Sequence, residues 1–278
     1  MMSNCITLQK KEDALVSLIS GMGNALVAFS GGCDSSLLAA AAYRALVDAA
    51  AAVTVRSPLT PEPDRIDAEQ VARGIGIKHF CIDVDELTEP DFIAGGPRRC
   101  YYCKKLRLRV IADFAARNGY TRVLDGSNAD DLLDYRPGMD AMKEFPIVSS
   151  PLLECGFTKD DVRALSREWG LSTWNKPAAA CLASRVAPPN RIEKRALEQI
   201  DEAESFLRGI LPPNSQVRVR HHGELARIEA ESVGFKVLIA RSREVVAALR
   251  TIGFRYVTLD LGGYEMGSLN PKSLRTTQ

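Results

Sequence analysis

The stretch that decides the fold is LVAFSGGCDSSLL, residues 26–38. Small and polar residues separate two apolar runs, and a plain turn would need only one or two of them. At the junction of a strand and a helix, successive backbone N–H groups can bind an anion. Gly31 and Gly32 would let the anion approach closely because they have no Cβ. The alternative is an ordinary turn, and the Walker pattern is excluded because no Gly-Lys-Ser/Thr follows.

Predicted strands and helices alternate through the first half of the chain. We expect strands at 26–29, 53–55, 78–84 and 122–126, and helices at 36–47, 63–74 and 104–118. This order predicts an α/β fold with a doubly wound, mostly parallel sheet. Ligands on such sheets bind beyond the carboxyl ends of the strands, where both FSGG and LDGSNADD (124–131) lie.

The second half of the chain has a different pattern. A helix is expected at 158–169, with Thr158 as its N-cap, and a charged helix at 191–208. Alternating apolar and charged residues from 216 onward predict strands, with a later helix at 245–252 and a strand at 256–260. We therefore predict two domains, 1–190 for ATP binding and a smaller C-terminal α+β domain, 191–278, for substrate binding and oligomerisation.

Composition limits the classes of function. The 278 residues include 36 Lys and Arg against 35 Asp and Glu, which gives no global reason to bind nucleic acid or a membrane. We find neither a signal peptide nor an apolar run of about 18 residues, so we expect a cytoplasmic protein. The chain has seven cysteines. In a reducing compartment, clustered cysteines more often bind a metal or react as thiolates than form disulfides.

The sequence SGGCDS (30–35) resembles the pyrophosphate loop of the ATP-pyrophosphatase, or PP-loop, superfamily. The resemblance implies an adenine nucleotide alpha hydrolase-like fold, cleavage of ATP between its α- and β-phosphates, and Mg²⁺ nearby. The ATP-binding residues that it implies are Ser30, Gly31, Gly32, Asp34, Ser35 and Ser36.

Longer stretches resemble the LarE family, the ATP-dependent sulfur transferases for the nickel-pincer nucleotide cofactor. They are VLDGSNADDLLDYRPGM (123–139), SPLLECGFTKDDVRALSREWGL (150–171), WNKPAAACLASR (174–185), VRVRHHGELARIE (217–229) and GFRYVTLDLGGYEMGSLN (253–270). The resemblance implies that ATP adenylates a carboxylate of a pyridinium mononucleotide and that sulfur then replaces AMP. It also implies that Ser184 and Arg185 face the site, with Arg185 binding phosphate, and that the protein is a homo-oligomer, with a hexamer as the expected assembly.

The cysteines depart from the better-known branch of that family, which sacrifices the sulfur of its own cysteine. Ala180 occupies the sacrificial position and has no sulfur to give, whereas Cys181 follows it. With Cys100 and Cys103 in RRCYYCKK (98–105), the chain resembles a second branch, in which three cysteines hold a 4Fe-4S cluster. The C-x-x-C spacing itself lets two thiolates reach one metal, although zinc or a redox pair would also suit it.

Two further groups are candidate ligands. Asp130 and Asp131, with Asp134, follow a predicted strand and either bind magnesium or begin a helix. Arg218 and Arg220 alternate on one strand, so they point to one face and can bind a phosphate together. A solvated strand face is the alternative, and we expect the adjacent histidines, 221 and 222, at the surface.

Two other functions remain open on sequence alone. The stretch 98–105 is basic and aromatic, which would also suit an enzyme that thiolates tRNA. No added RNA-binding domain is recognisable, however, and we expect a small-molecule nucleotide substrate. The third possibility is a nucleotide-binding regulator without turnover.

Overall fold

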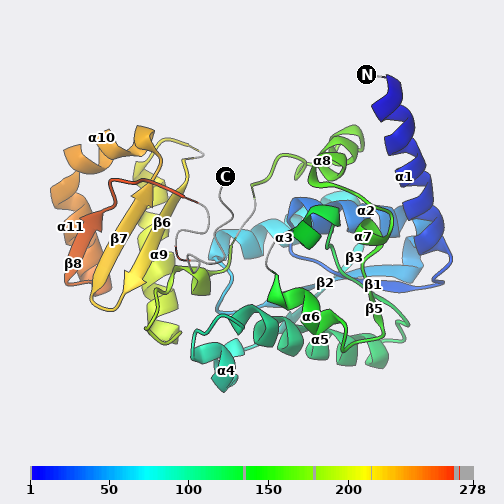
Figure 1. Cartoon of the computed structure of the whole chain (residues 1–278), viewed down its shortest axis with the longest axis horizontal. Coiled ribbons are helices and arrows are strands. Elements are labelled where there is room, and N and C mark those ends of the chain that lie inside the picture. The colour runs from blue at the N-terminus through cyan, green and yellow to red at the C-terminus, as the bar shows by residue number, and fades with distance from the viewer. Residues whose placement is uncertain (1, 134–135, 178–179, 214, 266–268, 270–278) are drawn as a thin grey trace. The chain divides into compact units, whose positions relative to one another are not determined.

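The structure is a computed structural model that describes residues 2–133, 136–177, 180–213, 215–265 and 269. The chain divides into two compact units (Figure 1). The first contains residues 1–85 and 100–179, and the second contains 86–99 and 180–278. The predicted functional domains, 1–190 for ATP binding and 191–278 for substrate binding and oligomerisation, stay a prediction.

The first unit is built on a parallel sheet in the order β3-β2-β1-β4-β5. The strands are β1 (Ala25–Ala28), β2 (Ala50–Arg56), β3 (Lys78–Asp83), β4 (Val123–Leu124) and β5 (Val148–Ser149). The α/β prediction is confirmed, with β5 as a strand that sequence reasoning missed.

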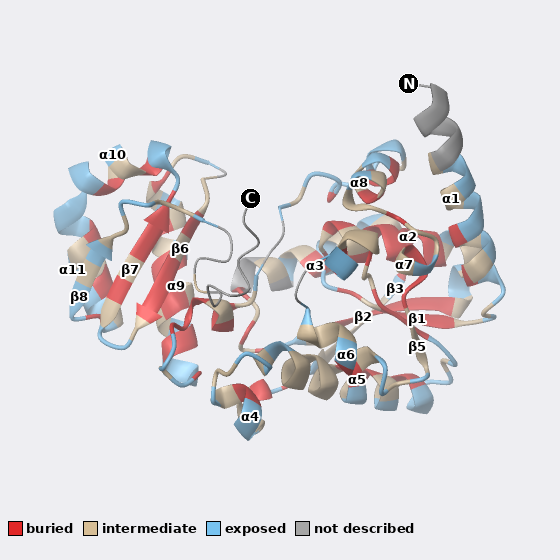
Figure 2. Ribbon diagram, in the orientation of Figure 1, coloured by how far each residue is buried: buried red, intermediate tan, exposed pale blue. Residues whose placement is uncertain are grey.

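Helices cover both faces of this sheet. Alternate strand residues divide between the faces: Val27 packs in the cluster that includes α2, whereas Leu26 packs in the cluster that includes α5. The first face is covered by α1 (Met2–Ser20), α2 (Cys33–Leu46), α3 (Glu62–Ile75) and α8 (Lys159–Glu168); the second is covered by α5 (Arg99–Arg117). Figure 2 shows the buried sheet between these layers.

The remaining helices of the first unit are short, and the predicted start of α5 was too late. They are α6 (Pro137–Met142) and α7 (Pro151–Glu154). Helix α5 begins five residues before the predicted start at 104, so Cys100 and Cys103 lie on its first turns. No helix in the described part of the chain is long and apolar enough to span a bilayer.

The second unit is an α+β arrangement with its own core. Strands β6 (Val217–His222) and β7 (Leu225–Ala230) are antiparallel, and β8 (Tyr256–Leu259) pairs parallel to β7. The helices packed with them are α9 (Lys194–Ile210), α10 (Ser232–Ala240) and α11 (Ser242–Ile252), while α4 (Pro90–Ile93) comes from the inserted segment. Sequence analysis missed α1, α4, α6, α7 and α10.

Gly31 is the tightest point of the first unit. Its φ is +68°, and a Cβ there would lie 2.8 Å from the Cα of Ala68 in α3. Real Cβ atoms do not approach a backbone atom so closely. Gly23, at φ +76°, has the same kind of backbone conformation, but an added Cβ would meet nothing within 4 Å.

Comparing Gly31→Ala with Gly23→Ala separates close packing from backbone strain. Gly23→Ala should cost about 1–2 kcal/mol of the free energy of unfolding, the usual cost of a left-handed alanine. Gly31→Ala should cost about 1–3 kcal/mol more, because α3 must also shift. Urea unfolding followed by tryptophan fluorescence measures this in the first unit alone, since Trp169 and Trp174 both lie there. Equal losses would contradict the close approach.

Candidate functional site

The glycine loop ends at the uncapped start of α2. Gly32 is the N-cap residue of α2 and supplies no side-chain acceptor, so its first-turn N–H groups have no side-chain cap. These donors and the helix dipole suit an anion. Gly32 has an extended backbone (φ −84°), and a Cβ there would meet only the Ser30 hydroxyl, at 3.3 Å. The space beside this residue therefore suits a phosphate.

The three serines of the loop differ in environment. Ser35 Oγ lies 3.1 Å from Ser30 Oγ and 3.2 Å from the Gly32 carbonyl oxygen, to which it donates. Ser36 is fully buried, and its hydroxyl has no hydrogen-bond partner within the described residues. Ser30 and Ser35 thus lie in the loop, whereas Ser36 faces the interior.

Asp34 is held by residues from two other segments. The amide of Asn128, beyond β4, donates to its Oδ1 at 3.0 Å, and the ammonium of Lys159, at the start of α8, donates to its Oδ2. Sequence analysis passed over both partners, although each falls within a quoted family stretch. The Lys159 side chain is 28% exposed, so this lysine is accessible to a nucleotide phosphate beside the loop.

The other predicted carboxylates already accept hydrogen bonds from the protein. Asp131 accepts the Asn128 backbone N–H at 3.0 Å and pairs with Arg136 at 2.9 Å, and burial raises its pKa. Asp130 accepts the backbone N–H of Lys159 at 2.8 Å. Asp134 lies outside the described residues. Within those residues, no group of three His, Cys, Asp or Glu is arranged to hold a metal ion.

Asp125 ties the carboxyl end of β4 to α5. Burial opposes its ionisation, but Lys104 and the hydroxyl and backbone N–H of Ser127 outweigh this, so its pKa is lowered. Lys104 follows Cys103 directly on α5. Gly126 comes next, and a Cβ there would make a tight contact, 3.3 Å from the Ser35 backbone nitrogen.

Cys100 and Cys103 share one face of α5. A separation of three residues on a helix places them on adjacent turns, with Cys100 exposed and Cys103 half-buried. A helix start lowers thiol pKa values in general and favours metal-binding thiolates. Cys181 belongs to the second unit, so the convergence of all three stays a prediction.

Cys33 has a different environment. Its thiol is buried under the segment after α8, 3.6 Å from the Trp174 carbonyl oxygen, and burial raises its pKa. It therefore has the character of a packed core thiol.

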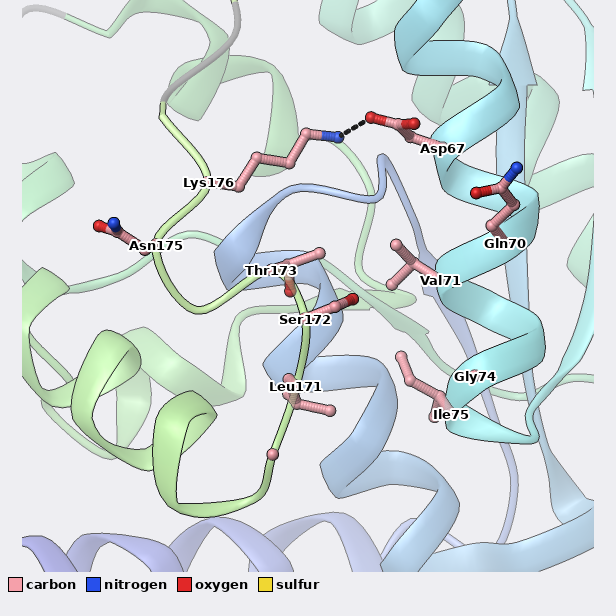
Figure 3. A pocket seen from close by; sticks show the side chains of 11 residues that line it. Asp67, Gln70, Val71, Gly74, Ile75, Leu171, Ser172, Thr173, Asn175 and Lys176 are labelled. Carbon is pink, nitrogen blue, oxygen red and sulfur yellow. Dashed lines mark hydrogen bonds and ion pairs between the residues drawn. The ribbon is translucent and has the colours of Figure 1, made fainter. Parts of the chain in front are cut away.

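A pocket of about 610 Å³ lies beside this segment, between α3 and residues 170–176 (Figure 3). Lys176 points toward Asp67 across its edge, with Nζ 3.1 Å from Oδ2, and also donates to the Gly31 carbonyl oxygen at 3.3 Å. Sequence analysis did not identify this pocket, which lacks a recognisable motif.

Three arginines of the second unit have different partners. Arg185 is buried and pairs with Glu204, while Arg220 is buried and pairs with Glu229. Arg218 donates to the Val217 carbonyl oxygen at 2.7 Å and lies over the ring of Tyr264. Burial, with Arg185 and then Arg220 nearby, lowers the pKa of Arg218. No carboxylate pairs with it in the described residues.

Ser184 and His221 are also fixed by protein contacts. The Ser184 hydroxyl donates to the Cys181 carbonyl oxygen at 2.7 Å. His221 is buried, 3.1 Å from the Gln199 side-chain oxygen and edge-on to Phe254. The expectation of two surface histidines was therefore wrong for His221, because α9 and α11 cover that face of β6.

Comparisons with known proteins agree with this arrangement. The family model described as asparagine synthase matches residues 13–221. The pyridinium-3,5-bisthiocarboxylic acid mononucleotide synthase of Lactiplantibacillus plantarum is 37% identical over 95% of each chain. An uncharacterized protein of Synechocystis is 40% identical over 95% of this chain and 98% of that one. A tRNA-specific 2-thiouridylase of Rickettsia typhi is 29% identical, over 56% of this chain and 53% of its own. The chain belongs to the asparagine synthase family of PP-loop proteins and, within it, to the LarE family of ATP-dependent sulfur transferases.

Proposed function

We propose that the protein adenylates a carboxylate of a pyridinium mononucleotide and then replaces AMP with sulfur. One observation carries the proposal: an uncapped helix start after a glycine loop, in a chain 37% identical to a synthase of a pyridinium bisthiocarboxylic acid mononucleotide. That product name indicates the corresponding biscarboxylic acid mononucleotide as the substrate.

The first half-reaction uses the glycine loop. A substrate carboxylate oxygen attacks the α-phosphorus of ATP, the bond to the β-phosphate oxygen breaks, and pyrophosphate leaves. Ser30, Gly31, Gly32 and Ser35 would bind the leaving phosphates through N–H and O–H donors, and Lys159 would neutralise their charge. Ser36 would support this turn from the interior. Asp34, released from Lys159, would help to hold Mg²⁺, with Asp130 and Asp131 as further candidate ligands.

The second half-reaction needs a sulfur nucleophile. Sulfur attacks the carbonyl carbon of the acyl adenylate, and the C–O bond to AMP breaks to give a thiocarboxylate. Thiolates at Cys100, Cys103 and Cys181 fit the ligand set of a 4Fe-4S cluster, since two already share a helix face near its N-terminus. When bound, such a cluster would supply sulfur without consuming a protein cysteine.

The arginines of the second unit would bind the substrate's phosphate. Arg218 is the direct ligand in this proposal, because its guanidinium is half-buried and its recorded hydrogen bonds are to neutral oxygens. Arg185 and Arg220 would contribute positive charge beside it, and Ser184 would shape the adjacent loop. The homo-oligomeric assembly, for which a hexamer is expected, stays a prediction.

A tRNA substrate is the second candidate, because tRNA 2-thiouridylases match about half of the chain. Pyrophosphate release separates the candidates. We expect it with ATP, Mg²⁺ and the biscarboxylic acid mononucleotide, but not with tRNA in its place. Release that requires tRNA would overturn the proposal, and no release with either would favour a regulator.

Gly32→Val and Asp34→Ala should abolish AMP formation. The valine fits the backbone of residue 32 but fills the space that a phosphate needs, and the alanine removes a magnesium ligand. Circular dichroism and the urea midpoint should stay near wild type. Gly23→Ala is the matched control, because it also replaces a glycine but lies outside the glycine loop. Normal adenylation in either loop variant would show that ATP binds elsewhere.

Replacing Cys100, Cys103 or Cys181 with alanine should remove iron and sulfur transfer but spare pyrophosphate release. The two half-reactions use different groups, so only the later one needs the thiolates. Anaerobic purification with iron and sulfide analysis measures the first loss, and mass spectrometry of the product measures the second. Cys155→Ala is the control. Iron retained by all three single variants would contradict the ligand set.

Arg218→Gln should raise the KM for the phosphorylated substrate by about ten- to a hundredfold. This corresponds to losing roughly 1.5–3 kcal/mol of a charged hydrogen bond. The KM for ATP should not change. The dephosphorylated nucleoside serves as the control ligand, since wild type and variant should bind it equally. An unchanged KM for the phosphorylated substrate would return Arg218 to a structural role.

A further inference from the structure

One buried ion pair holds the loop that carries Cys181. Arg185 is 3% exposed, and its Nε and Nη2 donate to the two carboxylate oxygens of Glu204 at 2.9 and 3.2 Å. The remaining terminal nitrogen, Nη1, donates to the carbonyl oxygens of Ala180 and, at 2.8 Å, Cys181. A single planar group thus joins a helix to the backbone on both sides of the Cys181 nitrogen.

Glu204 is itself fixed. It is fully buried on α9, and its Oε1 also accepts the Val219 backbone N–H of β6 at 3.1 Å. Arg208, one turn later on α9, donates to Oε2 at 3.3 Å. The Glu204 carboxylate therefore holds Arg185 in a fixed position relative to α9 and β6.

The backbone at Cys181 is restrained more than its side chain. Its carbonyl oxygen accepts from the Ser184 backbone N–H at 3.0 Å, the Ser184 hydroxyl and Arg185. The cysteine itself is only half-buried. Fixing the carbonyls of residues 180 and 181 fixes the direction of the Cα–Cβ bond, and so limits the thiol to the few staggered positions about that bond.

We propose that Arg185 and Glu204 are positioning residues for Cys181. Stability alone does not explain the pair, because a buried ion pair is often no more stabilising than an apolar one of similar size. Lysine could not replace arginine, since the role needs two separate sets of donors in one rigid plane. The contacts stand by themselves, and only the consequence for sulfur transfer rests on the proposed function.

The test is the double variant Arg185→Met with Glu204→Gln, in the full-length chain before iron is added. Both charges are removed together, so no buried charge is left alone, and the glutamine can still accept from Val219. We expect Cys181 to react with iodoacetamide about tenfold faster or more, because its loop opens more often. Cys100, in the other unit, should change by less than about twofold.

Sulfur transfer provides a second measurement. A misplaced sulfur ligand or donor lowers kcat by about ten- to a hundredfold, while the KM for ATP stays constant because the glycine loop is in the first unit. Arg241→Gln is the control: it breaks an exposed ion pair with Glu244 in the same unit without touching Glu204 or the loop, and both readouts should stay at wild type.

Thermal unfolding must show that the double variant is folded. If it is not, Arg185→Lys decides, because it keeps the charge and loses the two-sided contact; it should accelerate Cys181 labelling similarly. Wild-type labelling of Cys181 in a folded variant overturns the proposal. If the wild-type protein itself transfers no sulfur, the proposed function fails, but the labelling result still decides the positioning role.

Discussion

The start of α2 is the constraint on which the first unit depends. Gly31 and Ala68 leave no room for a Cβ between the glycine loop and α3, so the loop can pass α3 this closely only with a glycine. That path leaves the first N–H groups of α2 without side-chain caps. A folded protein rarely leaves such donors unsatisfied without a ligand or water to meet them. The close packing of Gly31 against α3 and the uncapped N–H groups of α2 are therefore two parts of one arrangement.

Polar residues from three segments meet at this point because parallel strands end on one edge of a sheet. Asp34 follows β1, Asn128 follows β4, and Lys159 begins α8, the second helix after β5. Gly126 lets the β4 loop approach the Ser35 backbone. The Asp34 carboxylate can exchange the Lys159 ammonium for a metal cation, and the ammonium set free can then pair with a phosphate. The arrangement suits a nucleotide site whose charge changes during turnover.

Local signals explain which parts of this fold were predictable. The glycine loop, the parallel strands and the Thr158 cap follow from turn chemistry, periodicity and capping, which act over a few residues. Helix α5 was predicted too short because the polar, cysteine-containing turn at 99–103 has no helical periodicity of its own. Lys159 was missed as a site residue because its role comes from Asp34, 125 positions away, and His221 because α9 and α11 bury it.

The arginines show why a motif alone does not assign a role. Arg218 and Arg220 point to one face of β6 and look equivalent in sequence. In the structure, Glu229 takes the guanidinium of Arg220 and Glu204 that of Arg185, whereas Arg218 stacks on Tyr264 and donates to neutral oxygens. A guanidinium already paired with a buried carboxylate has few donors left for a ligand. The charge of Arg218 is not paired with a carboxylate among the described residues. Burial and the neighbouring cations disfavour this charged form, as its lowered pKa shows. An incoming phosphate would relieve that cost, which is why we propose Arg218 as its ligand.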